Sequence, residues 1–325
     1  MKFRICSFAL LFALLLTVCA SPETAPAFRS PAHQLLNEGH VDELVTAMNA
    51  RLNTNPRDAE AANLMGRAYY SAGRWDEAIA AHERAVSMVG NNSNYQMWLA
   101  RAYGEKADAS SFVSALDFAR KFRSTMELAV QLDPNNVDAR SDLAEFYVQA
   151  PGMVGGGRDK AAAQADAITR LDPGIAAYIR ALLAEKDKNY GEAEAQLKNA
   201  IPVAKHPGRA WLNLASFYRR RNRPDDVQAT VRQAVASSKD NGVLLDASEL
   251  LVRVGRDFGG AADYLREYIN KGPHTEDAPV FHAHYVLGSI FEKQGDKRAA
   301  GDEYRAALAL ARDYGKAKAG LKRVQ

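Results

Sequence analysis

The chain of 325 residues contains only two cysteines, Cys6 and Cys19, and both lie within its first twenty residues. Everything after Cys19 therefore lacks disulfide bonds and cysteine metal ligands, and packing alone must hold the fold together. The sequence also lacks an excess of either charge, because without Lys2 and Arg4 it has 40 basic residues against 39 acidic ones. Such a balance argues against the overall positive field of nucleic-acid-binding proteins.

Motifs for catalysis and metal binding are scarce as well. The seven histidines are scattered, and His282 and His284 stand two residues apart, so on a helix they diverge rather than converge on one metal ion. No serine lies in a Gly-x-Ser-x-Gly motif. The sequence therefore predicts a protein that is not an enzyme and that uses no cofactor, no metal and no nucleic-acid partner.

The first twenty residues have the pattern of a secretory signal peptide. Lys2 and Arg4 precede an apolar run from Ile5 to Cys19, which is shorter than the roughly 20 residues of a membrane span, and small residues follow it. Cleavage before Ser21 is expected. The mature chain would then be exported, periplasmic or secreted, with no transmembrane span and with residues 21–31 as a flexible tether.

A second interpretation of this segment makes Cys19 a lipid anchor. Residues 16–19 read Leu-Thr-Val-Cys, which resembles the bacterial lipobox around a lipid-modified cysteine. Val18 departs from that motif, which normally has Gly, Ala or Ser just before the cysteine. The sequence favours plain cleavage and leaves a membrane-anchored lipoprotein as the alternative.

Most of the remaining chain repeats one pattern about every 34 residues. In the first half of a unit, a small residue is followed three positions later by an aromatic one, as in Gly66 with Tyr69 and Ala144 with Tyr147. In the second half, two alanines seven residues apart enclose a larger residue, as in Ala78, His82 and Ala85. On helices, the small residue lets a second helix approach closely, and the aromatic lies on the same face. Prolines end the units, because they cannot continue a helix: Pro56, Pro134, Pro173, Pro207 and Pro273.

This pattern resembles the tetratricopeptide repeat (TPR), a helix-turn-helix unit of about 34 residues, over roughly residues 58–312. The resemblance implies an all-α solenoid, in which antiparallel helix pairs stack into a right-handed superhelix with a concave inner face. It implies a partial repeat at 32–57, about seven units at 58–91, 92–135, 136–173, 174–207, 208–241, 242–273 and 276–312, and a capping helix at 313–325. A surplus of residues at 105–114 either lengthens a helix or forms a loop. An ordinary helical bundle is the alternative to the solenoid.

The stretch "APGMVGGGRD", residues 150–159, allows two interpretations. Three glycines beside Arg158 and Lys160 could cradle a phosphate, which gives nucleotide or small-anion binding at Gly155–Gly157 as an alternative function. A phosphate loop, however, follows a buried strand and places Ser or Thr after the lysine, whereas Lys160 is followed by alanines. The stretch is therefore expected to form the turn between two helices.

The concave face offers candidate residues for binding a partner. In TPR proteins, side chains at the second, fifth, ninth and twelfth places of the first helix line this face. Arg67 and Arg101 stand 34 residues apart at ninth places and are expected to be neighbours, able to hold a carboxylate or the carbonyl groups of a peptide. In the alternative, Arg101 pairs with Glu145, and Arg67 pairs with Glu60 or faces solvent. The resemblance implies this set of groove residues: Asn63, Arg67, Tyr70, Asn94, Met97, Arg101, Ser141 and Glu145.

The sequence thus predicts an exported scaffold that binds a protein or peptide partner through a concave groove. A lipid-anchored accessory subunit of an envelope assembly or transport machine is the second possibility.

Overall fold

The computed structural model of the protein describes residues 31–325. In that range the chain forms seventeen α-helices and two short 3-10 helices without a β-strand, which confirms the all-α prediction. No helix among these residues is long and apolar enough to span a membrane. The predicted signal peptide at 1–20 and the tether at 21–31 lie outside the described residues, except that Pro31 begins the first helix.

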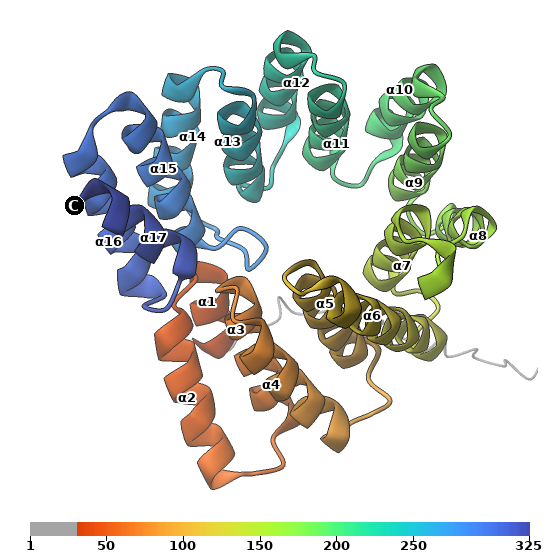
Figure 1. Cartoon of the computed structure of the whole chain (residues 1–325), viewed down its shortest axis with the longest axis horizontal. Coiled ribbons are helices and arrows are strands. Elements are labelled where there is room, and N and C mark those ends of the chain that lie inside the picture. The colour runs from red at the N-terminus through yellow and green to blue at the C-terminus, as the bar shows by residue number, and fades with distance from the viewer. Residues whose placement is uncertain (1–30) are drawn as a thin grey trace, which may run out of the picture.

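The helices follow one another in antiparallel pairs joined by short turns (Figure 1). The first four pairs are α1 (Pro31–Glu38) with α2 (Val41–Thr54), α3 (Ala59–Ser71) with α4 (Trp75–Met88), α5 (Ser93–Asp108) with α6 (Phe112–Leu132), and α7 (Val137–Gln149) with α8 (Arg158–Ile168). The next four are α9 (Pro173–Lys186) with α10 (Tyr190–Ala200), α11 (Pro207–Arg220) with α12 (Pro224–Ser237), α13 (Gly242–Val254) with α14 (Phe258–Asn270), and α15 (Val280–Gln294) with α16 (Lys297–Leu310). The last helix, α17 (Gly315–Val324), packs against α15 and α16, and the 3-10 helices are η1 (Gly152–Val154) and η2 (Ile201–Val203).

The small residues of the repeat lie where two helices approach most closely. A side-chain carbon on Gly66 would come within 2.7 Å of the His82 ring, and one on Gly288 within 2.7 Å of Tyr304. His82 and Tyr304 are fully buried at equivalent places on the second helix of their pairs. The repeat frame of the sequence therefore describes the packing of each pair.

The repeated tyrosines join neighbouring pairs by a hydrogen bond. The hydroxyls of Tyr103, Tyr147 and Tyr218 each donate to a glutamate on the second helix of the preceding pair. Burial and the adjacent carboxylate raise the pKa of Tyr218, so its hydroxyl stays protonated and can donate. The aromatic position thus binds one unit to the next in addition to filling space.

Helix starts explain one error in the predicted boundaries. The side chain of Asp172 accepts a hydrogen bond from the backbone N–H of Ile175 and caps α9, in which Pro173 is the first residue. Pro207 likewise begins α11. Proline is well suited to the first turn because that turn needs no backbone donor. Pro173 and Pro207 therefore begin units, whereas the sequence analysis placed them at unit ends.

The surplus at 105–114 lengthens helices instead of forming a loop. Helix α5 continues to Asp108 and α6 begins at Phe112, so only a short turn separates them. Helix α6 has 21 residues, against 13 in α7, which follows it. The α5–α6 hairpin is therefore longer than its neighbour.

The stacked pairs close into a ring in which the first helices meet the last (Figure 1). One buried apolar cluster includes Leu36 and Leu44 from the first pair together with Phe281 and Tyr314 from the last helices. Around it, the backbone N–H of Arg312 donates to Asp42 over 2.8 Å. We call the region where α1–α3 contact α15–α17 the closure interface. The sequence predicts the stacked pairs but not this contact between the two ends.

Candidate functional site

A central cavity of about 1410 Å³ lies inside the ring. Helices of the first pairs line it together with Arg209 of α11 and with residues 275–277 of the α14–α15 connection, which reaches inward in Figure 1. Pockets for small molecules measure about 300–1,000 Å³. The central cavity is larger and is lined by both halves of the chain, so it has room for a segment of a polypeptide.

Seven of the eight predicted groove residues line the central cavity. They are Asn63, Arg67, Tyr70, Asn94, Met97, Arg101 and Glu145. The eighth, Ser141, lines an adjoining cavity of about 420 Å³, which also includes Glu145. The structure thus brings the predicted set together on the inner face.

The two arginines are neighbours, as expected, and each already pairs with a carboxylate of the cavity. Both guanidinium groups lie against the ring of Trp98, at 5.0 Å for Arg67 and 4.9 Å for Arg101. Nε of Arg101 donates to Asp142 over 2.6 Å, and Nε of Arg67 donates to Glu276 over 2.8 Å. The alternative interpretation, that the two arginines pair within the chain, therefore holds with other partners than Glu145 and Glu60. Asp142 lies one helical turn before Glu145 on α7, and Glu276 reaches Arg67 only through ring closure.

The other predicted residues have mixed roles. Asn63 is 4% exposed and bonded to His82, so it is part of the packing between α3 and α4. Met97 is also 4% exposed. Asn94 accepts a hydrogen bond from Asn136 over 3.2 Å. Burial and Glu105 raise the pKa of Tyr70, whose hydroxyl donates to Glu105 over 3.3 Å.

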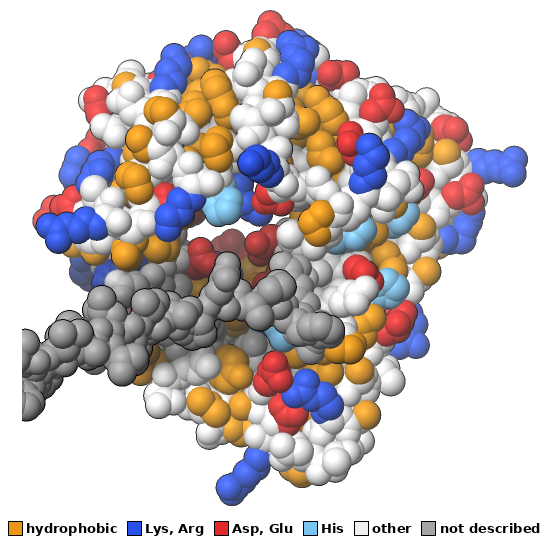
Figure 2. Space-filling view, turned by 180° about the vertical axis from the view of Figure 1, so that it is seen from behind, with side chains coloured by type: hydrophobic (Ala, Val, Ile, Leu, Met, Phe, Trp, Pro, Cys, Tyr) orange, Lys and Arg blue, Asp and Glu red, His pale blue; other side chains and the backbone are white. Residues whose placement is uncertain are grey.

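Carboxylates outnumber arginines in the lining of the central cavity. Nine line it, against three arginines: Glu60, Glu105, Asp108, Asp138, Asp142, Glu145, Asp240, Glu276 and Asp277. Each of the three arginines pairs with one of these carboxylates, Arg67 with Glu276, Arg101 with Asp142 and Arg209 with Asp240. Figure 2 shows Asp and Glu side chains within the hollow at the middle of the ring. The cavity therefore has a surplus of negative charge.

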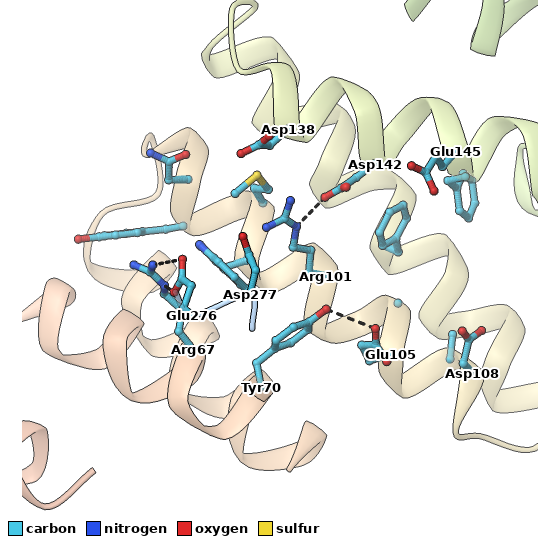
Figure 3. Close-up of a pocket in the computed structure, with 18 of the residues that line it drawn as sticks. Arg67, Tyr70, Arg101, Glu105, Asp108, Asp138, Asp142, Glu145, Glu276 and Asp277 are labelled. Carbon is cyan, nitrogen blue, oxygen red and sulfur yellow. Dashed lines mark hydrogen bonds and ion pairs between the residues drawn. The ribbon is translucent and has the colours of Figure 1, made fainter. Parts of the chain in front are cut away.

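Several of the surplus carboxylates have no partner within residues 31–325. Asp108, Asp138 and Asp277 make neither a hydrogen bond nor an ion pair through their side chains in that range. Figure 3 shows Asp138 and Asp277 beside the Arg101–Asp142 pair, with Asp108 further along α5. These groups can receive the positive charges of a ligand without first breaking an internal contact.

The pKa of Glu145 is raised by its surroundings in the cavity. Burial raises its pKa to about 7, and the nearby charge of Asp142 adds to that effect. The hydroxyl of Tyr178 donates a hydrogen bond to Glu145, which offsets only part of the shift. A carboxyl group with this pKa is partly protonated near neutral pH, and a cation beside it would favour its charged form.

The histidines form no metal site in the described part of the chain. His282 is bonded to Tyr314 and Glu249, and His284 to Glu303, so the two diverge as the sequence predicted. Within residues 31–325, no group of three or more His, Cys, Asp and Glu side chains is arranged to hold a metal ion.

The glycine-rich stretch forms the turn between α7 and α8, together with η1. The N–H groups of Gly155, Gly156 and Gly157 donate to the backbone oxygens of Gly152, Pro151 and Tyr147, so none is open to a phosphate. Lys160 donates to the carbonyl oxygen of Gly155 over 3.0 Å. The left-handed φ of 100° at Gly155 accounts for a glycine there. This geometry does not support the nucleotide or anion alternative.

The sequence analysis missed the acidic side of the cavity. Asp138, Asp142 and Glu145 stand four and three residues apart, which places them on one face of α7, so their spacing was a usable signal. Glu276 and Asp277 gave no such signal, because they reach the cavity only through the closed ring.

Comparisons with known proteins agree with this fold. Models described as tetratricopeptide repeat match residues 61–94 and residues 245–315. No curated protein matches the chain.

Solved structures with similar folds are distant in sequence. Yeast Tom70 is 16% identical with a TM-score of 0.53, over 96% of this chain and 67% of that one. A tetratricopeptide repeat protein from Parabacteroides merdae is 14% identical with a TM-score of 0.48, over 90% of this chain and 95% of that one. A thermophilic TPR protein of Thermus thermophilus is 20% identical with a TM-score of 0.45, over 68% and 95%. At 16% identity, the similarity to Tom70 concerns the fold alone.

Proposed function

The chain is a tetratricopeptide repeat protein, and we propose that it is a scaffold that binds a positively charged segment of a protein partner inside its ring. The TPR fold supports a role in protein–protein interaction. The observation that carries the finer proposal is the lining of the central cavity, where nine carboxylates face three arginines that are already paired. Lysine and arginine side chains of a partner would pair with the unpaired carboxylates, Asp108, Asp138 and Asp277.

A lysine-rich peptide tests this proposal. We expect a labelled peptide of lysine, serine and glycine to bind the mature protein, with an affinity that falls as salt is added, and a glutamate peptide of equal length not to bind. Replacing Asp138 and Asp277 with asparagine should weaken binding by about tenfold, because each removes an unpaired carboxylate. Fluorescence anisotropy measures the effect.

The matched control neutralises two carboxylates outside the cavities. Asp225 on α12 and Asp263 on α14 are 92% and 75% exposed and line neither cavity. Their replacement with asparagine should leave the affinity unchanged. Equal losses in both double variants would mean that the peptide responds to net charge and not to the cavity, and the proposal would fail.

The same peptide should bind more weakly at lower pH. Because Glu145 has a pKa of about 7 in the unoccupied cavity and a cation stabilises its charged form, affinity is highest above that pKa and falls as Glu145 is protonated. Lysine side chains stay charged over this range, since their pKa is about 10.4. Titrations on both sides of neutral pH should show this loss in the native protein and a smaller one in Glu145→Gln.

Export is a further part of the proposal. It is supported by the basic start, apolar run and small residues of the first twenty residues, which lie outside the described range. A mature chain that begins at Ser21, measured by mass spectrometry of the protein from its native cells, is the expected result. A lipid-modified Cys19 would instead identify a membrane-anchored accessory subunit, and an intact Met1 would contradict both.

A further inference from the structure

The end of the α5–α6 hairpin has exposed apolar side chains that no other helix of residues 31–325 covers. Phe112 and Val113, the first two residues of α6, are 73% and 78% exposed. No residue of α6 before Met126 is buried. The excess length of α6 thus creates an apolar face that packing within residues 31–325 does not explain.

One side of this exposed helix forms the wall of a groove. Phe112, Ala115, Leu116, Ala119 and Phe122 all line the central cavity, and their spacing places them on one face of α6. The opposite wall comes from the end of α7 and from η1, through Phe146, Pro151 and Val154. The rings of Phe122 on α6 and Phe146 on α7 stack with their centroids 5.1 Å apart, so the two walls are in contact there. We call these eight residues the hairpin groove.

Acidic side chains line the same cavity as the hairpin groove. Glu105 and Asp108 on α5 and Glu145 on α7 line the same cavity. On α6, Arg123 donates to the carbonyl oxygen of Val154 and so lies at one edge of the groove, whereas Lys121 pairs with Asp117. Three carboxylates thus accompany the apolar groove against one arginine, Arg123, and the complement of this arrangement is an apolar side chain flanked by positive ones.

We propose that the hairpin groove holds the apolar side chains of an amphipathic partner segment, whose lysine or arginine residues face Glu105, Asp108 and Glu145. This inference rests on the proposed function, since the groove opens into the same cavity and the basic residues of one segment can occupy both. It adds an apolar requirement to the charge requirement. A partner segment is then selected by its pattern of leucine-like and basic residues, and not by charge alone.

Two peptides with the same number of lysines separate the apolar contribution from the charge. One has leucines on one face of an amphipathic helix, and the other has serine in place of each leucine. We expect the lysine–leucine peptide to bind the native protein about tenfold more tightly than the lysine–serine peptide, because burial of apolar side chains adds to the pairing of charges. Anisotropy titrations at equal salt measure both.

Substitutions test whether the tighter binding of the lysine–leucine peptide arises at the hairpin groove. Leu116→Ser and Phe112→Ser should each remove most of the tenfold difference in affinity between the two peptides. Val113→Ser is the matched control, because Val113 is equally exposed on the same turn but does not line the cavity. It should retain the full difference, and circular dichroism should show the same helix content in all three variants.

The outcomes separate the two proposals. Binding of the lysine–serine peptide without a gain from leucine overturns the hairpin groove and leaves the proposed function standing. Absence of binding by either peptide overturns the proposed function. If Val113→Ser removes the affinity difference between the two peptides as fully as Phe112→Ser and Leu116→Ser do, the assignment of the apolar contact to the cavity-lining face of α6 is wrong. If instead the protein self-associates by light scattering and Leu116→Ser abolishes that association, the groove is an interface between copies of the chain, and a partner segment is excluded.

Discussion

Replacing Arg67 and Arg101 together with glutamine should strengthen the binding of a lysine-rich peptide by about tenfold. Each arginine is paired with a carboxylate of the cavity, Arg101 with Asp142 and Arg67 with Glu276. Removing the two cations exposes those carboxylates to the ligand. A carboxylate-binding groove, which is one of the two interpretations that the sequence leaves open, predicts the opposite result, a loss of binding in the same variant. Anisotropy with the lysine–serine peptide distinguishes the two.

The control for this prediction removes a whole ion pair. In Arg67→Gln with Glu276→Gln, the charge of the cavity is unchanged, so the affinity should stay near that of the native protein. Loss of Arg101 leaves Asp142 without its partner, which should cost about 3 kcal/mol of stability. The thermal unfolding of each variant should therefore be measured first, and the titrations carried out at a temperature at which all variants are folded. Abolished binding in a folded Arg67→Gln, Arg101→Gln protein would contradict the acidic-cavity account.

Replacing Phe281 with alanine should open the ring. Phe281 is fully buried in the closure interface, and its ring packs edge-on against Tyr314 with centroids 4.9 Å apart. A Phe-to-Ala change in such a place costs about 3 kcal/mol or more. In a solenoid each pair contacts only its neighbours, so the cost falls mainly on the contact between the two ends. Small-angle scattering should show a larger radius of gyration with little loss of helix.

Leu214→Ala supplies the comparison for Phe281→Ala. Leu214 is 2% exposed within the stack of α11 and lies outside the closure interface. This change should lower stability without separating the two ends. Opening the ring also moves the connection at residues 275–277 away from α3, where Glu276 pairs with Arg67, so Phe281→Ala should weaken peptide binding more than Leu214→Ala does. Equal radii of gyration for both variants and the native protein would show that Phe281 is not needed for closure.

The helix pairs were predictable because their determinants are local. A small residue, an aromatic three positions later and an alanine-flanked knob describe contacts within a pair, and Gly66 against His82 shows that contact directly. Residues with a positive φ also recur at one position of the repeat, two residues before the second helix of a pair. Examples are Gly73, Asn222 and Gly295. Such features repeat in the sequence because they repeat in the structure.

The chemistry of the cavity was less predictable, because it depends on contacts between distant parts of the chain. Arg67 could be placed on the inner face from its position in the repeat. Its partner, Glu276, lies 209 residues away and reaches it only through ring closure. Asp142 could have been found from the sequence, since it shares a helical face with Asp138 and Glu145. Without it, the sequence analysis did not consider the acidic side of the cavity.

Zero-length cross-linking tests the central claim most directly. A carbodiimide joins a lysine amine to a carboxylate that it touches, so the lysine–serine peptide can be linked to the native protein and the modified residues identified by mass spectrometry. Our account predicts links to the unpaired carboxylates inside the ring, Asp108, Asp138 and Asp277. Links confined to carboxylates on the outer helices, such as Asp225 and Asp263, would contradict it.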